Sequence, residues 1–157
     1  RRRWLEWRPK SYLDVVGRMT DVAGVRVLHL FQWQYAIIHR EIMKKVSDGD
    51  WILAEKPKAY SWDPESKLRY DNLSVDVQIK PSYYTSVHYT IKTNKETFRT
   101  CEIQVRTLFE EIWGEVDHIV NYPEESKDED CRKKIRVLSH LVVAGNKLVE
   151  SIKWQDS

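Results

Sequence analysis

A short polar pattern over residues 101–107 has the residue types and spacing to carry chemistry. The segment reads Cys-Glu-Ile-Gln-Val-Arg-Thr. Successive side chains of a β-strand point to opposite faces, so Glu102, Gln104 and Arg106 would share one face. Burying a carboxylate, an amide and a guanidinium side by side costs free energy unless a partner offsets their desolvation. A polyanionic ligand with a metal ion would be such a partner. We therefore predict the floor of a site; the alternative is an edge or solvent-facing strand with a mixed polar face.

Two carboxylates lie where they could share a divalent cation. Asp21 opens an apolar, β-branched run over residues 21–30, and Glu102 lies on the polar face just described. Carboxylates on adjacent strands can hold Mg²⁺ together, with substrate phosphates completing its coordination. Gly24 would permit the bend that brings Asp21 and Arg26 to one side, since five positions separate them. The alternative for Asp21 is an aspartate that caps or ends a helix.

Cations and aromatic rings gather in two further segments. One contains Lys80, Tyr84 and His88, so a base could stack on the tyrosine while the lysine or histidine meets a phosphate, and such stacking is worth about 1–3 kcal/mol. The alternative is a tyrosine-rich hairpin whose rings only pack together. In the other segment Arg8 and Lys10 flank a proline, a pattern that suits phosphates but is also common in solvated basic termini.

Several enzyme classes do not fit the sequence. It has neither a Walker loop nor a Rossmann glycine fingerprint, which argues against ordinary ATPases and dehydrogenases. Glu111, Glu115 and His118 would share one helix face, but their spacing is not that of an HExxH zinc motif. Asp117 with His118 is too short a pattern to indicate an HD phosphohydrolase.

Composition is typical of a globular protein rich in aromatic residues. The 157 residues are 41% hydrophobic and 32% charged, which fits one domain over residues 1–157. Seven Trp and eight Tyr supply flat faces on which nucleobases could stack.

The formal charge of +2 does not favour duplex nucleic acid or membrane as a partner, and no apolar run or signal peptide predicts a membrane segment. The chain begins at Arg1, so we expect a piece of a longer protein. Cys101 and Cys131 lack a paired spacing, so we expect reduced thiols and a cytoplasmic location.

Hydrophobic periodicity predicts an α+β fold with a mixed sheet flanked by helices. A helix would follow Ser11, and a hairpin is expected near Asn94. The predicted strands cover residues 21–30, 51–60, 73–80, 86–93 and 98–106, with a loop over 61–72. The predicted helices cover residues 35–46, 108–122 and 131–154, the last closing the domain.

Taken together, these motifs resemble the RelA/SpoT synthetase domain. The matching segments are Asp21-Val-Ala-Gly-Val-Arg26, Ser86-Val-His88 and Glu102-Ile-Gln-Val-Arg-Thr107, followed by Trp113, His118 and Tyr122. They stand in the family's order: an aspartate before AGxR, then Y-x-S-x-H, then E-I-Q-[IV]-R-T, then W…H…Y. The resemblance runs from Arg8 to about Tyr122. It implies a mixed sheet flanked by helices and related to nucleotidyltransferases.

The resemblance also implies a reaction, the transfer of pyrophosphate from ATP to the 3′-hydroxyl of GDP or GTP. By resemblance, Asp21 and Glu102 would hold Mg²⁺, and Glu102 would assist deprotonation of the attacking hydroxyl. Arg8, Lys10 and Arg26 would bind ATP. The residues implied on the acceptor side are Lys80, Tyr84, His88, Gln104, Arg106 and His118, with Tyr84 stacking on the base.

Two departures from the family pattern concern the choice of acceptor and the loop contacts to ATP. Where the family reads N-G-Y-[RQ]-S, this chain has Tyr83 for the glycine and Thr85 for the Arg or Gln. The K-D-Y-I loop is replaced by Lys56-Pro-Lys58. The alternatives are therefore the same transfer to a tRNA 3′ end or an adenine nucleotide, as in toxin-like relatives, or a catalytically silent nucleotide-binding regulatory module. A homo-oligomer is possible, because the stripe on the closing helix suits either a core or an interface.

Overall fold

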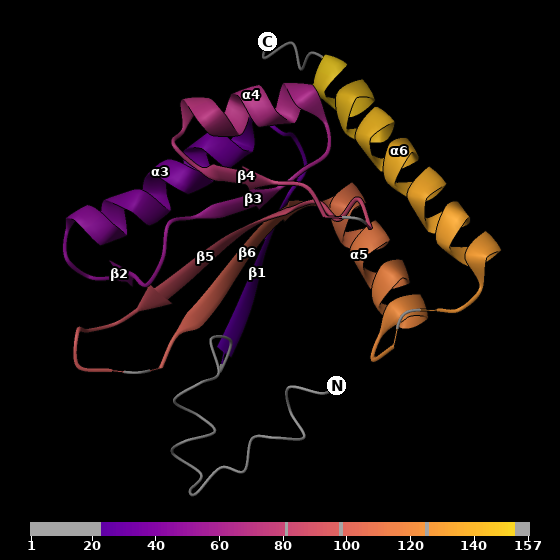
Figure 1. Ribbon diagram of the computed structural model, residues 1–157. Helices are drawn as coiled ribbons and strands as arrows, with labels where there is room; N and C mark the ends of the chain where they lie inside the picture. Colours follow the sequence, from indigo (N-terminus) through magenta and orange to yellow (C-terminus); the bar gives the residue numbers. More distant parts are fainter. Residues whose placement is uncertain (1–22, 81, 98, 125, 153–157) are drawn as a thin grey trace, which may run out of the picture.

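The computed structural model describes residues 23–80, 82–97, 99–124 and 126–152 (Figure 1). Arg8, Lys10 and Asp21 lie outside these ranges, as does the helix expected after Ser11. The described strands are β1 (Ala23–His29), β2 (Ile52–Leu53), β3 (Lys58–Tyr60), β4 (Asp76–Gln78), β5 (Ser86–Lys92) and β6 (Cys101–Thr107). The described helices are α3 (Gln34–Ser47), α4 (Pro64–Asn72), α5 (Leu108–Asn121) and α6 (Glu129–Ser151).

The strands form one mixed sheet in the order β1-β6-β5-β3-β4, with β2 paired to β5. Strand β1 is parallel to β6 and β4 is parallel to β3, whereas β5 runs antiparallel to both of its main neighbours. Consecutive strands β5 and β6 pair directly, which confirms the hairpin expected between them. The α+β class with a mixed sheet is therefore confirmed.

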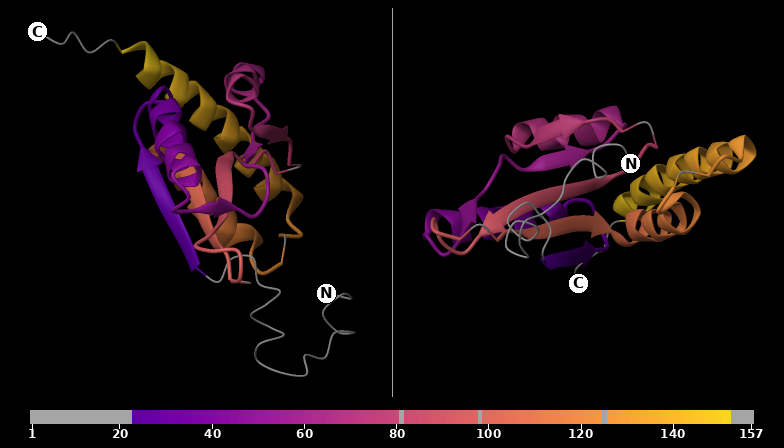
Figure 2. Two further views of the ribbon diagram at one scale, coloured as in Figure 1. Left: turned by 90° about the vertical axis from the view of Figure 1, so that its left-hand side faces the viewer. Right: turned by 60° about the horizontal axis from the view of Figure 1, so that its bottom comes forward.

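The two faces of the sheet have different chemistry. One face packs against α3 and α4 through a core whose buried members are Tyr35, Ile42, Ala59, Val75, Val87, Tyr89, Ile91, Ile103 and Val105. Helices α5 and α6 lie side by side, away from α3, and share a second core built on Trp113, Ile135 and Val142 (Figures 1 and 2). The face of the sheet turned away from the first core carries the polar residues.

Strand register assembles this polar face from three neighbouring strands. Arg26 of β1 is level with Gln104 of β6, and Gly24 is level with Glu102. On the other side of β6, His88 of β5 is opposite Gln104. Because paired residues in a sheet point to the same side, these side chains share one face. The alternation predicted for residues 101–107 is confirmed.

A capping box joins β6 directly to α5. Thr107 ends the strand and caps the helix: its side chain accepts from the backbone N–H of Glu110, and the Glu110 carboxylate accepts from the N–H of Thr107. Both residues are buried. This reciprocal cap explains why the chain turns from strand to helix without a loop. It also brings the first turns of α5 beside the polar face.

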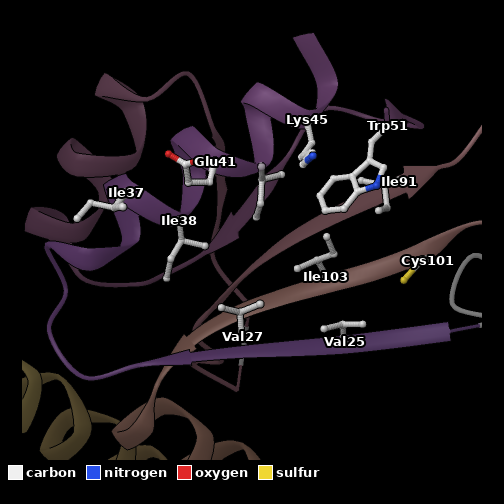
Figure 3. A pocket seen from close by; sticks show the side chains of 11 residues that line it. Val25, Val27, Ile37, Ile38, Glu41, Lys45, Trp51, Ile91, Cys101 and Ile103 are labelled. Atoms are coloured by element: carbon white, nitrogen blue, oxygen red, sulfur yellow. The ribbon is translucent and has the colours of Figure 1, made fainter. Parts of the chain in front are cut away.

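An apolar cavity of about 580 Å³ lies between α3 and the other face of the sheet (Figure 3). Val25, Val27 and Ile103 line it from the sheet, while Ile37 and Ile38 line it from the helix. The sheet separates this cavity from the polar face, so it is not part of the candidate site. Within the described ranges, no helix has both the length and the apolar character needed to cross a bilayer.

Three predicted elements differ from the structure. Residues 61–72 were expected to form a loop, but α4 begins at Pro64, where Asp63 caps it by accepting from the backbone N–H and hydroxyl of Ser66. Proline fits the first position of a helix because its missing N–H needs no partner there. The strand expected over residues 51–60 is two short strands, and the strand expected over residues 73–80 is reduced to β4.

Candidate active site

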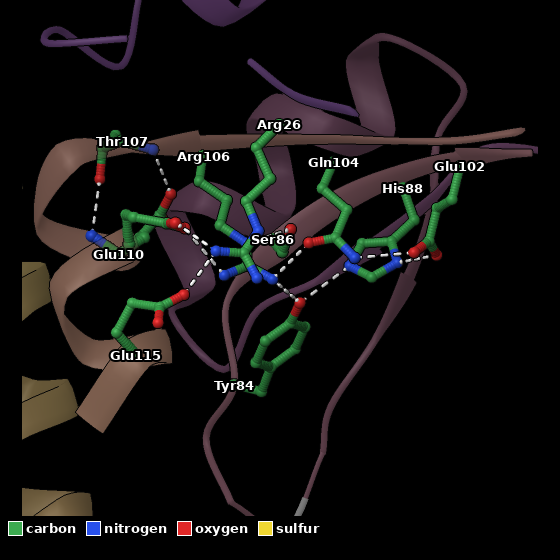
Figure 4. Close-up of polar contacts among 11 residues, drawn as sticks. Arg26, Tyr84, Ser86, His88, Glu102, Gln104, Arg106, Thr107, Glu110 and Glu115 are labelled. Atoms are coloured by element: carbon green, nitrogen blue, oxygen red, sulfur yellow. Dashed lines mark hydrogen bonds and ion pairs between the residues drawn. The ribbon is translucent and has the colours of Figure 1, made fainter. Parts of the chain in front are cut away.

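Five side chains on the polar face form a closed ring of hydrogen bonds (Figure 4). The Arg106 guanidinium donates to the Tyr84 hydroxyl and, at 2.6 Å, to Oε1 of Gln104. The Tyr84 hydroxyl lies 3.0 Å from Nε2 of His88, and Nδ1 of His88 lies 2.6 Å from Oε1 of Glu102. Nε2 of Gln104 donates to Oε2 of Glu102 at 2.7 Å and so closes the ring.

The chemistry of these groups assigns a donor and an acceptor to each bond of the ring. A guanidinium can only donate and an ionised carboxylate can only accept, so the Tyr84 oxygen accepts from Arg106 and Glu102 accepts from the Nδ1–H of His88. In neutral His88 the other nitrogen, Nε2, is then unprotonated and accepts the proton of the Tyr84 hydroxyl. The ring therefore selects one tautomer of His88, and both oxygens of Glu102 accept a hydrogen bond.

Glu102 is held as a carboxylate by this arrangement. The hydrogen bond from His88 is the main reason that its pKa falls to about 2, and the bond from Gln104 and the charge of Lys80 lower the pKa further. Partial burial acts in the opposite direction but is outweighed. The side chain is 24% exposed, so the carboxylate is still accessible from solvent. An accessible carboxylate that is ionised at neutral pH is suited to binding a cation.

Two arginines approach the ring from different strands and meet the carboxylates of α5. Nη1 of Arg26 donates to Glu111 at 2.6 Å and to Glu115 at 2.5 Å. Arg106 donates to the other oxygen of Glu111 at 3.0 Å and to the hydroxyl of Ser86 at 3.1 Å. The Arg106 side chain is only 5% exposed, whereas that of Arg26 is 49% exposed. Arg106 is thus locked in place, and Arg26 is open to a ligand.

Lys80 extends the site toward two aromatic rings. Its Nζ lies 3.9 Å from the centre of the Tyr60 ring and 4.5 Å from the centre of the Tyr84 ring. Burial lowers the pKa of Lys80. The Tyr84 ring also packs against Trp113, with 5.9 Å between ring centres. A base that stacks on Tyr84 would therefore have to displace the Lys80 ammonium from that ring.

Most of the residues predicted for the site and described by the structure come together. They are Arg26, Lys80, Tyr84, His88, Glu102, Gln104 and Arg106. His118 does not join this network: it is exposed on α5 and stacks on Tyr122, with ring centres 4.5 Å apart. The positions of Arg8, Lys10 and Asp21 relative to the site stay predictions.

Sequence reasoning missed three members of the site. Glu111 and Glu115 were noticed only as one helix face, yet they bind the arginines. Their spacing of four residues directly after the Thr107 cap was the available signal. Tyr60 was also missed; its ring meets His88 edge to face at 5.1 Å, and the alternation of β3 next to β5 could have placed it there.

The described residues do not form a complete metal cage, because they contain no group of three or more Asp, Glu, His or Cys side chains able to hold an ion. Glu102 nevertheless has the chemistry that Mg²⁺ requires, an ionised oxygen ligand facing solvent. Mg²⁺ commonly uses one or two carboxylates and takes its other ligands from water and substrate phosphates. The site therefore fits a cation that binds together with its substrate.

Solved structures with a similar fold include a small alarmone synthetase and a GTP pyrophosphokinase family protein. Small alarmone synthetase 1 from Bacillus subtilis bound to its product pppGpp has a TM-score of 0.65 and 20% identity, covering 96% of this chain and 69% of that chain. The same synthetase bound to AMPCPP has a TM-score of 0.54 and 20% identity, and the match covers 89% of this chain and 63% of that chain. A GTP pyrophosphokinase family protein from Streptococcus pneumoniae has a TM-score of 0.55 and 21% identity, and the match covers 92% of this chain and 70% of that chain.

At these identities the likeness establishes a shared fold, and this chain spans about two thirds of the length of those proteins. No curated protein matches the sequence. The sequence pattern described as the region found in RelA/SpoT proteins does match, over residues 8–127. That range covers most of the chain and includes every residue of the hydrogen-bonded ring, so the chain belongs to the RelA/SpoT family.

Proposed function

We propose that this protein transfers pyrophosphate from ATP to the 3′-hydroxyl of GDP or GTP and so makes a guanosine alarmone. The hydroxyl oxygen would attack the β-phosphorus of ATP, the bond from that phosphorus to the α–β bridging oxygen would break, and AMP would leave. The observation that carries the proposal is the ionised Glu102 within a ring of polar groups on a face that also presents Arg26 and Lys80. Family membership and the fold of the solved neighbours support it.

Phosphoryl-type transfer depends mainly on positioning and on neutralising charge. Glu102 and Asp21 would hold Mg²⁺, which when bound would neutralise charge on the transferred group. Arg26, the exposed arginine of the site, would contact the ATP phosphates together with Arg8 and Lys10. On the other side of β6, Lys80 would meet the phosphates of the acceptor, whose base would stack on Tyr84.

The geometry refines the role of Glu102. A carboxylate with a pKa of about 2 is a weak base for a hydroxyl proton, because proton transfer is most effective when the two pKa values are better matched. The same carboxylate is well suited to bind a cation and to accept a hydrogen bond from the attacking hydroxyl. We therefore infer that Glu102 orients the attacking hydroxyl and supplies negative charge for the cation. It would take up the hydroxyl proton only if a bound ligand separated it from His88.

One specific observation bears on the silent-module alternative. Tyr83, which replaces the family's glycine, does not fill the polar face: its ring contacts Trp62 and His140 instead. The five side chains of the hydrogen-bonded ring keep their mutual contacts beside it. This favours an active enzyme over a blocked one.

An acceptor panel tests the proposal. Purified protein, Mg²⁺ and ATP labelled in the β and γ phosphates would be incubated with GDP, GTP, ADP or tRNA. We expect label on the guanine nucleotides and equal release of AMP. Label on tRNA or ADP alone would move the acceptor to the toxin-like alternative, and nucleotide binding without AMP release would indicate a silent module.

Matched variants test whether the polar face does the chemistry. Glu102→Gln keeps the shape of the side chain and removes its charge, and we expect at least a hundredfold loss of transfer, the order of magnitude seen when a key electrostatic group is removed. Glu96→Gln makes the same change at an exposed position in the segment between β5 and β6 and serves as the control. Equal activity of the two variants would contradict the assignment.

Location and assembly also stay proposals. The two cysteines are free, which supports the cytoplasmic location expected from them. On α6, Val137, Leu141 and Leu148 are 58%, 63% and 67% exposed, and such a stripe on one helix supports self-association. Light scattering on the wild type and on Leu141→Glu would show whether an oligomer exists and depends on this stripe.

A further inference from the structure

Tyr83 is adjacent to Tyr84 in sequence but contacts a different part of the molecule. Its φ of 60° lies in the left-handed region, which bulky residues rarely adopt. Its ring centre lies 5.5 Å from that of Trp62 and 5.7 Å from that of His140 on α6. The guanidinium carbon of Arg136, also on α6, lies 5.8 Å from the same ring centre. Tyr83 thus ties the segment before β5 to α6.

Tyr84, in contrast, contacts the candidate active site. Its hydroxyl bonds to His88 and Arg106, and its ring lies under Lys80. A hydrogen bond of 2.9 Å from the backbone N–H of Tyr83 to the carbonyl of Lys80 closes the turn before it. The left-handed backbone at Tyr83 lets its ring reach α6 while the ring of the next residue, Tyr84, reaches the candidate active site.

Strained backbone persists only where the surroundings hold it, and here the aromatic contacts of Tyr83 do so. We propose that Tyr83 is a positioning residue for the acceptor nucleotide: packed against Trp62 and His140, whose rings also contact each other, it holds the backbone that directs Tyr84 into the site. This inference rests on the proposed function, since it assumes that Tyr84 receives the acceptor base. It makes α6 part of the acceptor site, although α6 supplies no member of the hydrogen-bonded ring.

Three substitutions at Tyr83 separate the side chain from the backbone. Tyr83→Phe keeps the ring, Tyr83→Ala removes the ring and keeps the strain, and Tyr83→Gly removes both. His140→Ala removes a partner of the ring without changing the turn. Lys133→Ala, at an exposed position on the same helix, is the control.

Steady-state kinetics with the acceptor and with ATP would distinguish the variants. We expect Tyr83→Ala to raise the KM for the acceptor about tenfold or more, since small misplacements of a binding group have effects of this size. Tyr83→Gly and His140→Ala should give smaller increases, Tyr83→Phe and Lys133→Ala should match the wild type, and the KM for ATP should stay constant. An equal acceptor KM for Tyr83→Ala and Tyr83→Phe, or a parallel rise in both KM values, would overturn the inference.

A measurement without nucleotides keeps this inference separate from the proposed function. Urea unfolding of Tyr83→Ala, His140→Ala and the double variant forms a double-mutant cycle. Coupling between the two positions is expected from the contact of their rings. Strictly additive effects would overturn the inference even if the acceptor proves to be another molecule. If the wild type binds no nucleotide while the coupling is present, the proposed function fails and only the contact between Tyr83 and α6 stands.

Discussion

Glu102 should make the stability of this protein sensitive to acid in a way that a single substitution removes. In the folded protein its pKa is about 2, compared with an ordinary value of 4.5. A difference of about 2.5 at about 1.36 kcal/mol per pKa unit corresponds to about 3 kcal/mol, and we expect about 1 to 2 kcal/mol because solvent partly screens the carboxylate. Because the folded pKa is depressed, this stabilisation is present above pH 4.5 and is lost as the pH falls toward 2.

Urea unfolding at several pH values between about 7 and 3 would measure the effect, with the free energy of unfolding taken from linear extrapolation. The wild type should lose about 1 to 2 kcal/mol more than Glu102→Gln over this range, because the variant cannot titrate at residue 102. Other carboxyl groups titrate in both proteins and cancel in the difference. Glu96→Gln should follow the wild type. If the curves of the wild type and Glu102→Gln run parallel, the hydrogen-bonded ring does not stabilise the carboxylate and the reasoning fails.

Three further substitutions have expected outcomes that follow from local geometry. Thr107→Ala removes the capping box and should lower the free energy of unfolding in urea by about 1–2 kcal/mol. Gly114→Ala places a Cβ 2.6 Å from Nη1 of Arg106, so the guanidinium must shift. Because this shift disturbs the site, transfer activity should fall at least tenfold in the labelled assay. The melting temperature should stay the same, since alanine favours a helix over glycine by about 1 kcal/mol and offsets the clash. Gly145→Ala places a Cβ 3.1 Å from the Phe109 ring between α5 and α6, and overpacking should outweigh the helix gain by about 1 kcal/mol in urea unfolding. Unchanged activity of Gly114→Ala, or a more stable Gly145→Ala, would contradict these assignments.

The polar face was predictable because strand alternation is a strong rule. The spacing of Glu102, Gln104 and Arg106 requires a common face in any strand, whatever the surrounding fold. Register could not be predicted in the same way. That Arg26 lies level with Gln104 follows from the parallel pairing of β1, which ends at His29, with β6, which begins only at Cys101. Only long-range packing determines such a pairing.

The errors have physical reasons too. Charged residues and a proline made residues 61–72 resemble a loop, although Asp63 followed by Pro64 is a helix start. His118, which the resemblance alone assigns to the acceptor side, stacks on Tyr122 outside the hydrogen-bonded ring, and its role stays a prediction. The hydrogen-bonded ring itself was beyond sequence reasoning, because it depends on side-chain directions on two strands and on the turn before β5.

The two arginines of the site show how a polyanion could enter without dismantling it. Arg106 is almost fully buried and bonded at every nitrogen of its guanidinium, so breaking it free would leave buried donors without partners. The pairs of Arg26 with Glu111 and Glu115 are half exposed on the arginine side, and ion pairs exposed to solvent contribute little to stability. A phosphate could therefore replace Glu115 at Arg26 at small cost, while Arg106 keeps Glu111 in place. Under the proposed function, Arg106 would maintain the site, while Arg26 would exchange an exposed ion pair for the ligand.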